Sequence, residues 1–205
     1  MADQVRAAVI YYSATGNVYT LAERAAQTAE KTGADVRLRK VRELAPRTAI
    51  EANGAWKRNV EQTREVAEAT VDDLEWADVV LLGTPTRFGN VAAQLKQYMD
   101  QAGPLWAKGK LVDKVFAGFT STTTRHGGHE STLLALYTTV YHWGGIVVGP
   151  GYTDPVQFEA GNPYGASHTS ANGETPVGDI DLGSIEVTAE RAVRVARALK
   201  VGKDA

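Results

Sequence analysis

The sequence of 205 residues contains no cysteine. This absence excludes a thiol nucleophile, a disulfide, and any zinc or iron–sulfur site with cysteine ligands. The sequence also lacks an apolar run that approaches the roughly 20 residues of a membrane span. Its first residues do not show the pattern of a cleaved signal peptide. We therefore expect a cytoplasmic protein that makes no contact with a membrane.

An excess of charge of one sign is also missing. Lys and Arg number 22, Asp and Glu number 24, and the net charge is −2, with no long basic run. Proteins that bind nucleic acid usually gather basic residues in a patch or stripe, so we expect no nucleic acid partner. His126, His129 and Glu130 lie close together, but no second group of His or carboxylate residues lies nearby in the sequence. We therefore expect no metal site.

The composition that remains is that of an ordinary globular protein, 43% hydrophobic and 22% charged. The length suits one α/β domain over residues 1–205 better than two domains. Apolar runs of strand length alternate with helical periodicity, which predicts a parallel sheet. The predicted strands lie near residues 7–12, 36–41, 78–83, 115–120 and 145–149, and the predicted helices include residues 91–99, 131–143 and 185–199.

A loop of small and hydroxyl residues follows the first predicted strand. Residues 13–18 read Ser-Ala-Thr-Gly-Asn-Val, and a helical pattern begins directly behind them. Unpaired N–H groups and the helix dipole make such a junction a site for anions. Ser13 and Thr15 add hydroxyl donors, and the loop contains no Lys or Arg. Neutral donors suit a monophosphate, although an ordinary turn that caps a helix has the same residues.

Two more polar loops follow predicted strands. Residues 84–90 come after the apolar run 78–83, and residues 121–130 come after the run 115–120. In an open parallel sheet, ligands bind beyond the carboxyl ends of the strands. We therefore expect the three loops to meet at one edge of the sheet.

Two segments fit the alternation of strands and helices less well. Residues 42–71 are interrupted by Pro46 and by Asn53-Gly54, and we expect Trp56 to pack this excursion onto the domain. Residues 150–183 are rich in Gly, Pro, Asn, Ser and Thr, which is typical of a functional or mobile loop.

The second loop carries a specific resemblance. The string GTPTRFGN at residues 83–90 closely resembles the flavin-cradling loop of the WrbA family, the flavodoxin-like NAD(P)H:quinone oxidoreductases. The loop at residues 13–18, the Leu105-Trp106 pair, His142 and the PYGA segment at residues 163–166 extend the resemblance over nearly the whole chain. It implies a flavodoxin-like, doubly wound five-stranded parallel sheet in the order 2-1-3-4-5, with helices on both faces.

The resemblance also implies a function. The cofactor would be FMN, and the reaction a two-electron, ping-pong reduction of quinones by NADH or NADPH in a homotetramer (or dimer of dimers). Because the flavin supplies the redox chemistry, no protein nucleophile is needed. Arg87 would stabilise charge on the flavin, and His142 would do likewise or relay a proton.

Site residues transfer from the family by position. Trp106 would face the flavin pocket of another subunit and stack on the quinone, although a Trp that packs a turn onto its own domain has the same pattern. Thr15 stands where many members carry a Tyr that contacts the nicotinamide, so Thr15 is assigned to substrate binding as well. The residues assigned to FMN are Ser13, Ala14, Thr15, Gly16, Asn17, Val18, Pro85, Thr86, Arg87, Phe88, Gly89, Asn90, Ser121, Thr122, Gly127 and His142.

Two other classes of function stay open. A flavodoxin-type one-electron carrier would hold FMN in a monomer, but the strong acidic bias of such carriers is absent here. A non-catalytic regulatory flavoprotein is the other alternative, and nothing in the sequence provides a DNA-reading element.

Overall fold

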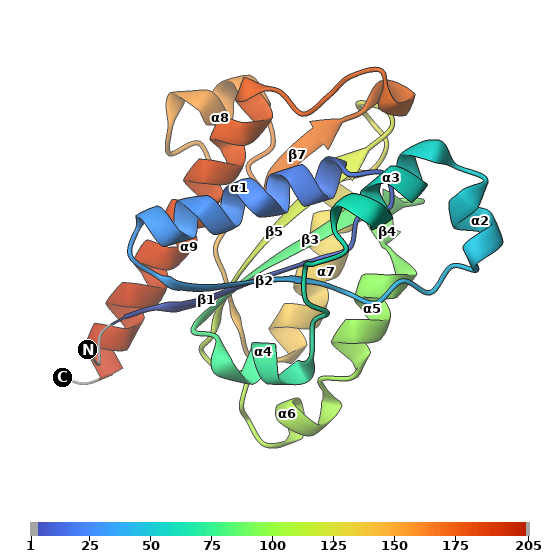
Figure 1. Ribbon diagram of the computed structural model, residues 1–205. Coiled ribbons are helices and arrows are strands. Elements are labelled where there is room, and N and C mark those ends of the chain that lie inside the picture. Colours follow the sequence, from blue (N-terminus) through green and yellow to red (C-terminus); the bar gives the residue numbers. More distant parts are fainter. Residues whose placement is uncertain (1–3, 204–205) are drawn as a thin grey trace.

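Parallel strands form the middle of the molecule (Figure 1). This computed structural model describes residues 4–203. The main path of the sheet runs β2-β1-β3-β5-β6, while β4 pairs with β3 and β7 pairs with β5. The strands are β1 (Arg6–Tyr11), β2 (Asp35–Lys40), β3 (Val79–Arg87), β4 (Asn90–Val91), β5 (Val115–Thr122), β6 (Ile146–Val147) and β7 (Ala166–Thr169). The main path is the predicted order 2-1-3-4-5, but the described sheet has seven strands instead of five.

Helices cover both faces of the sheet because successive strand side chains point to opposite sides. Val9 belongs to the hydrophobic cluster under α1 and α9, whereas Ala8 and Ile10 belong to the cluster under α4, α5, α6 and α7. The helices are α1 (Asn17–Lys31), α2 (Arg47–Glu51), α3 (Gly54–Gln62), α4 (Val71–Trp76), α5 (Ala93–Asp100), α6 (Gly103–Ala107), α7 (His129–His142), α8 (Pro155–Ala160) and α9 (Asp179–Lys203).

The fifth position of the sheet is split between two strands. β6 pairs with the start of β5, and β7 pairs with its end, from Phe119↔Ala166 to Thr122↔Thr169. The predicted strand at residues 145–149 is therefore correct only for its middle. The chain leaves the sheet after β6, forms α8, and returns where Gly165 packs against Gly118. A Cβ on Gly165 would lie 2.2 Å from the Gly118 carbonyl oxygen, so this close approach requires glycine.

The loop predicted at residues 84–90 is mostly a hairpin. β3 continues to Arg87 and turns back into β4 through the antiparallel pairs Thr86↔Val91 and Arg87↔Asn90. The predicted helix at residues 91–99 begins later, as α5. Asn90 lies in β4 and does not cap that helix; the Thr84 hydroxyl oxygen instead accepts the Ala92 N–H at 3.0 Å.

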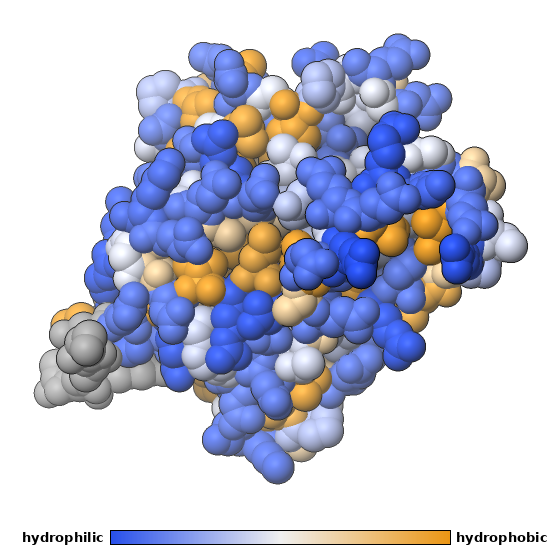
Figure 2. All heavy atoms as spheres, viewed as in Figure 1, coloured by the Kyte–Doolittle hydropathy of each residue, from blue (hydrophilic) through white to orange (hydrophobic). Residues whose placement is uncertain are grey.

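The excursion between β2 and β3 carries three helices. The Asn53 side chain caps α3 by accepting the N–H groups of Ala55 and Trp56. The Trp56 indole N–H donates to Glu43 at 3.0 Å, and Trp56 packs against the hydrophobic cluster under α4, α5, α6 and α7, which confirms that it packs the excursion onto the domain. Figure 2 shows that the face bearing α1 and α3 is largely hydrophilic, with scattered hydrophobic residues. Among the helices of residues 4–203, none has the length and apolar character required to cross a membrane.

Candidate functional site

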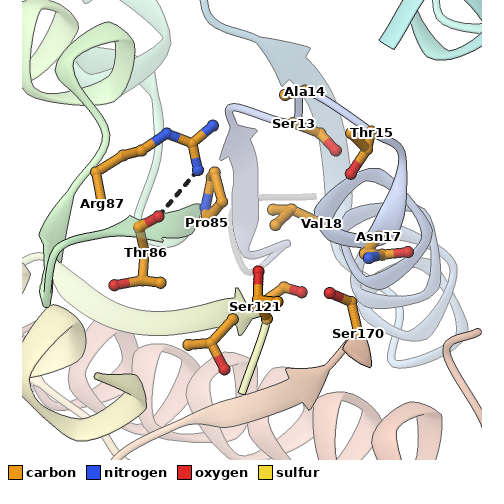
Figure 3. Close-up of a pocket in the computed structure, with 12 residues that line it drawn as sticks. Ser13, Ala14, Thr15, Asn17, Val18, Pro85, Thr86, Arg87, Ser121 and Ser170 are labelled. Carbon is orange, nitrogen blue, oxygen red and sulfur yellow. Dashed lines mark hydrogen bonds between the residues drawn. The ribbon is translucent and has the colours of Figure 1, made fainter. Parts of the chain in front are cut away.

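The ends of β1, β3 and β5 meet around one cavity of about 170 Å³, as the strand–loop pattern predicts (Figure 3). The segment that follows β7 closes its remaining side. The cavity is lined by Ser13, Ala14, Thr15, Asn17, Val18, Pro85, Thr86, Arg87, Ser121, Thr122, Thr123 and Ser170. The three predicted loops thus contribute to a single site.

The loop between β1 and α1 presents free backbone donors. Gly16 occupies the N-cap position with φ 105°, and no side chain caps the helix. The Ser13 hydroxyl oxygen accepts the Gly16 N–H at 3.1 Å, whereas the N–H groups of Ala14 and Thr15 have no acceptor within residues 4–203. Free N–H groups at an uncapped helix N-terminus, with no basic side chain in the loop, favour a bound anion.

The Thr86 hydroxyl has its proton available for a ligand. Its oxygen accepts the Gly89 N–H at 3.1 Å and the Thr132 hydroxyl at 2.8 Å. A hydroxyl has two lone pairs and one proton, so these two bonds leave the Thr86 proton free to donate. Thr86 also lines the cavity, which makes its hydroxyl a candidate donor to a ligand.

The Thr122 hydroxyl, by contrast, uses its proton in a hydrogen bond within the protein. It donates to the Thr124 carbonyl at 2.7 Å and lies 2.6 Å from Nε2 of His129, which also lies 3.1 Å from the His168 carbonyl. A carbonyl can only accept, so His129 carries its proton on Nε2 and donates to both oxygens. Burial lowers the pKa of His129, and its place at the start of α7 also disfavours a positive charge. His129 therefore ties α7 to the ends of β5 and β7.

Arg87 supplies the cationic side chain of the cavity. Its guanidinium donates to the Thr86 carbonyl at 2.9 Å, and the remaining N–H groups are exposed at the mouth (Figure 3). This bond to the Thr86 carbonyl holds the positive charge on the hairpin side of the cavity.

Several predicted residues shape the turns without lining the cavity. Phe88 is fully exposed at the hairpin tip with φ 53°, followed by Gly89 with φ 77° and by Asn90 in β4. Gly16 and Gly127 belong to the β1–α1 and β5–α7 loops, and a Cβ on Gly127 would lie 2.9 Å from the Thr124 carbonyl oxygen. These positions fix the backbone around the cavity.

The structure does not bring His142 and Trp106 to the cavity of their own chain. His142 ends α7, a helix of 14 residues, so it lies about 20 Å along the helix axis from the first residue, His129, which contacts Thr122 of the cavity wall. The Trp106 indole N–H donates to the His142 carbonyl at 2.9 Å, and Trp106 is 56% exposed. Both residues are exposed, and the bond that joins them runs from the Trp106 side chain to the backbone of His142.

Sequence reasoning missed three residues around the cavity. Ser170 and Thr123 line it, and the Ser170 N–H donates to the Thr122 carbonyl at 2.8 Å. The polar composition of residues 150–183 indicates a functional segment, but it does not indicate which of these residues lies at the cavity. The sequence around His129 suggests at most a metal ligand and gives no sign of its bond to Thr122. No cluster of three potential metal ligands occurs in the part of the chain that the structure describes.

Comparison with known proteins supports a flavin site. The family model for NADPH-dependent FMN reductase matches residues 5–155. An NAD(P)H dehydrogenase (quinone) of Deinococcus radiodurans is 45% identical over 200 residues, which cover 97% of this chain and 99% of that protein. One from Paracoccus denitrificans is 43% identical over 81% of this chain and 80% of its own. The crystal structure of a flavodoxin, WrbA-like protein from Agrobacterium tumefaciens aligns with a TM-score of 0.67 and 26% identity, and covers 95% of this chain and 99% of that chain.

Proposed function

The chain belongs to the family of NADPH-dependent FMN reductases and groups with the NAD(P)H dehydrogenases (quinone), and we propose that it uses a bound FMN to reduce quinones with NADH or NADPH. The observation that carries this proposal is the cavity where three strand ends present neutral donors beside an uncapped helix. Such a site suits one phosphate group and a polar chain attached to it.

The residues present fit FMN. The free N–H groups of Ala14 and Thr15 and the Ser13 hydroxyl would hold its phosphate. The cavity of about 170 Å³ is smaller than the roughly 300–1,000 Å³ of pockets that enclose a whole drug-sized ligand. One end of FMN would therefore be enclosed, and the ring system would extend to the rim beside Arg87. When bound, FMN supplies reversible hydride chemistry that no side chain provides.

The hairpin would tune and orient the ring system. The free proton of the Thr86 hydroxyl would donate to an acceptor of the ring, and the Arg87 guanidinium would stabilise negative charge there. Gly16, Phe88, Gly89, Asn90 and Gly127 would act through the turns that they shape. In the described chain, the residues that line the cavity include no carboxylate and no imidazole, so these residues bind and orient, and the protons exchanged with the substrates come from elsewhere.

We assign Trp106 and His142 to the cavity of a neighbouring copy in a homotetramer (or dimer of dimers). Their hydrogen-bonded pair is exposed, and Tyr141 beside it is 65% exposed. A second copy seated there would cover these aromatic side chains and bring them to the open rim of the cavity. Trp106 would stack on a planar quinone, and His142 would relay a proton. Thr15 at the cavity wall would contact the nicotinamide.

The two substrates would use the same open face in turn, which implies ping-pong kinetics. Because only one side of the ring would be accessible above the cavity, the oxidised nucleotide would leave before the quinone binds. We further propose a cytoplasmic location, where NADH and NADPH are available.

The test is direct. Purified protein should be yellow, should retain FMN in preference to FAD, and should reduce benzoquinone with NADH or NADPH. Protein reconstituted with FMN that reduces benzoquinone with neither nucleotide would contradict the proposal.

A further inference from the structure

Helix α3 lies behind the loop that would hold the cofactor phosphate, and it contributes one buried side chain to that loop. Asn59, which is 4% exposed, donates from Nδ2 to the Ser13 carbonyl at 2.8 Å. Figure 1 shows α3 beside the start of α1, although α3 belongs to the excursion after β2. This contact joins residues that are 46 positions apart in the sequence.

The bond to Asn59 orients the first peptide group of the loop. Ser13 lies between two cavities, because it lines the candidate site and also a cavity of about 180 Å³ on the side of Asn59. In a planar trans peptide, the C=O and the following N–H point in opposite directions. Holding the Ser13 carbonyl toward Asn59 therefore turns the Ala14 N–H toward the candidate site, where that N–H has no protein acceptor.

The other polar atom of the Asn59 side chain makes no hydrogen bond within the described residues, so the bond from Nδ2 to the Ser13 carbonyl is the main polar contact of this side chain. Asn59 Oδ1 is buried without a hydrogen-bond partner among residues 4–203, an arrangement that is unfavourable for a buried carbonyl oxygen. The Asn59 backbone carbonyl accepts from the Thr63 N–H at 3.0 Å and from the Thr63 hydroxyl at 2.8 Å. The backbone is thus fixed, and the side chain has a single strong contact.

Helix α3 is itself anchored to the end of β1. Glu43 accepts the Trp56 indole N–H at 3.0 Å and the Tyr12 hydroxyl at 3.0 Å, and it also accepts Gln94 Nε2 at 2.9 Å. Tyr12 directly precedes Ser13. The excursion is therefore attached to the loop at two adjacent residues, which makes it a rigid support for the loop.

We propose that Asn59 is a positioning residue for phosphate binding: it holds the loop in the conformation that directs the Ala14 N–H at the phosphate of FMN. This inference rests on the proposed function. It gives residues 42–71 a role in cofactor selection, because FMN and riboflavin differ by the phosphate alone.

The test compares FMN and riboflavin binding to the apoprotein by quenching of flavin fluorescence. Asn59→Ala should weaken FMN binding about tenfold, because it removes one hydrogen bond that positions a donor to a charged ligand. It should leave riboflavin binding unchanged. Asn59→Asp should weaken FMN binding at least as much, because its carboxylate would face the Ser13 carbonyl. The matched control is Asn53→Ala, which removes the cap of α3 without touching the loop and should preserve the ratio of the two affinities.

Each outcome decides between the proposals. An Asn59→Ala protein with the wild-type ratio of FMN to riboflavin affinity would overturn the role of Asn59 and leave the proposed function intact. An equal fall of that ratio in Asn53→Ala would also overturn it, because the effect would then follow the stability of α3. Wild-type protein that binds riboflavin as tightly as FMN would overturn both. If Asn59→Ala does not fold, Asn59→Asp, which keeps the size of the side chain, gives the same comparison.

Discussion

At the scale of single residues, the candidate site depends on where hydroxyl protons are free. Thr86 and Thr122 are both threonines at the ends of neighbouring strands, yet their hydroxyls are used differently. The Thr86 oxygen accepts two bonds, which leaves its proton free of the protein, whereas the Thr122 hydroxyl donates its proton to the Thr124 carbonyl. Two residues that look equivalent in the sequence therefore have different roles.

Replacing Thr86 by Val should weaken FMN binding, because the variant loses the free donor. The expected loss is about 1 kcal/mol, the typical net value of one hydrogen bond. The matched control is Thr132→Val, which removes the partner of Thr86 but leaves the Thr86 proton in place. Titration of the two apoproteins with FMN measures the difference. Equal losses in both variants would show that the Thr86 proton does not reach the ligand.

His129 should make the stability of the protein depend on pH. Burial lowers its pKa in the folded protein, whereas the unfolded chain takes up a proton at a pKa of about 6.5. Below that value the unfolded state binds more protons, so the free energy of unfolding should fall as the pH falls and should be at its full value above it. Urea unfolding between about pH 8 and pH 5 checks this. His129→Gln, which keeps an N–H donor, should have a shallower slope, and an unchanged slope would exclude His129 as its source.

At the scale of secondary-structure elements, the central strands were predictable and the last part of the sheet was not. Uninterrupted apolar runs identify β1, β3 and β5, because strands buried on both faces need them. The run at residues 145–149 located β6 but not its two-residue length, whereas β7 is too short to give such a signal and pairs with β5 only after the excursion through α8. Ser170 follows β7, which is why its place at the cavity could not be predicted from the sequence.

The return of the chain to β5 gives a prediction about stability. Gly165→Ala would place a Cβ 2.2 Å from the Gly118 carbonyl oxygen, and a backbone atom cannot move aside as a flexible side chain can. We expect a loss of about 1–3 kcal/mol or more, as for other overpacked positions. Gly178→Ala is the control, because a Cβ there meets nothing within 4 Å and its φ is not positive. Urea unfolding of the two variants should separate them clearly, and similar midpoints would contradict the close packing of the returning segment.

For the second loop, residues 84–90, the sequence indicates the position of the loop but not its backbone structure. The resemblance of the GTPTRFGN string predicts a flavin-binding loop, and three of its residues, Pro85, Thr86 and Arg87, line the cavity. The hairpin itself was missed, because a two-residue strand such as β4 has no periodicity to read. Likewise, the contact of Asn59 with the first loop could not be predicted, because Pro46 and Asn53-Gly54 interrupt the helical pattern of the segment that contains α3.

At the scale of the whole molecule, the residues that we assign to the proposed reaction do not all lie at one cavity of the same chain. The cavity encloses only part of a ligand of the size of FMN, and Trp106 and His142 lie far from it in the same chain. Sequence resemblance assigns both residues to the site. Whether they reach a cavity depends on how copies of the chain assemble. A single sequence carries no direct signal of such an assembly.

Trp106→Ala should therefore raise the KM for the quinone more than it weakens FMN binding, because the stacking surface would be lost while the cavity stays intact. Phe158→Ala is a suitable control, since Phe158 is also exposed, at 68%, but lies on α8. Steady-state kinetics and FMN titration measure the two effects separately. Light scattering that shows a stable monomer would rule out the cross-subunit role of Trp106.

The central claim is that this cavity binds FMN and passes two electrons from a nicotinamide nucleotide to a quinone in separate steps. Double-mixing stopped-flow spectroscopy without oxygen tests it most directly. Mixing the FMN-loaded protein with NADH or NADPH alone should abolish the visible flavin absorbance, and a second mixing with benzoquinone should restore it. Absorbance that neither nucleotide changes, or that changes only when the quinone is already present, would contradict the account.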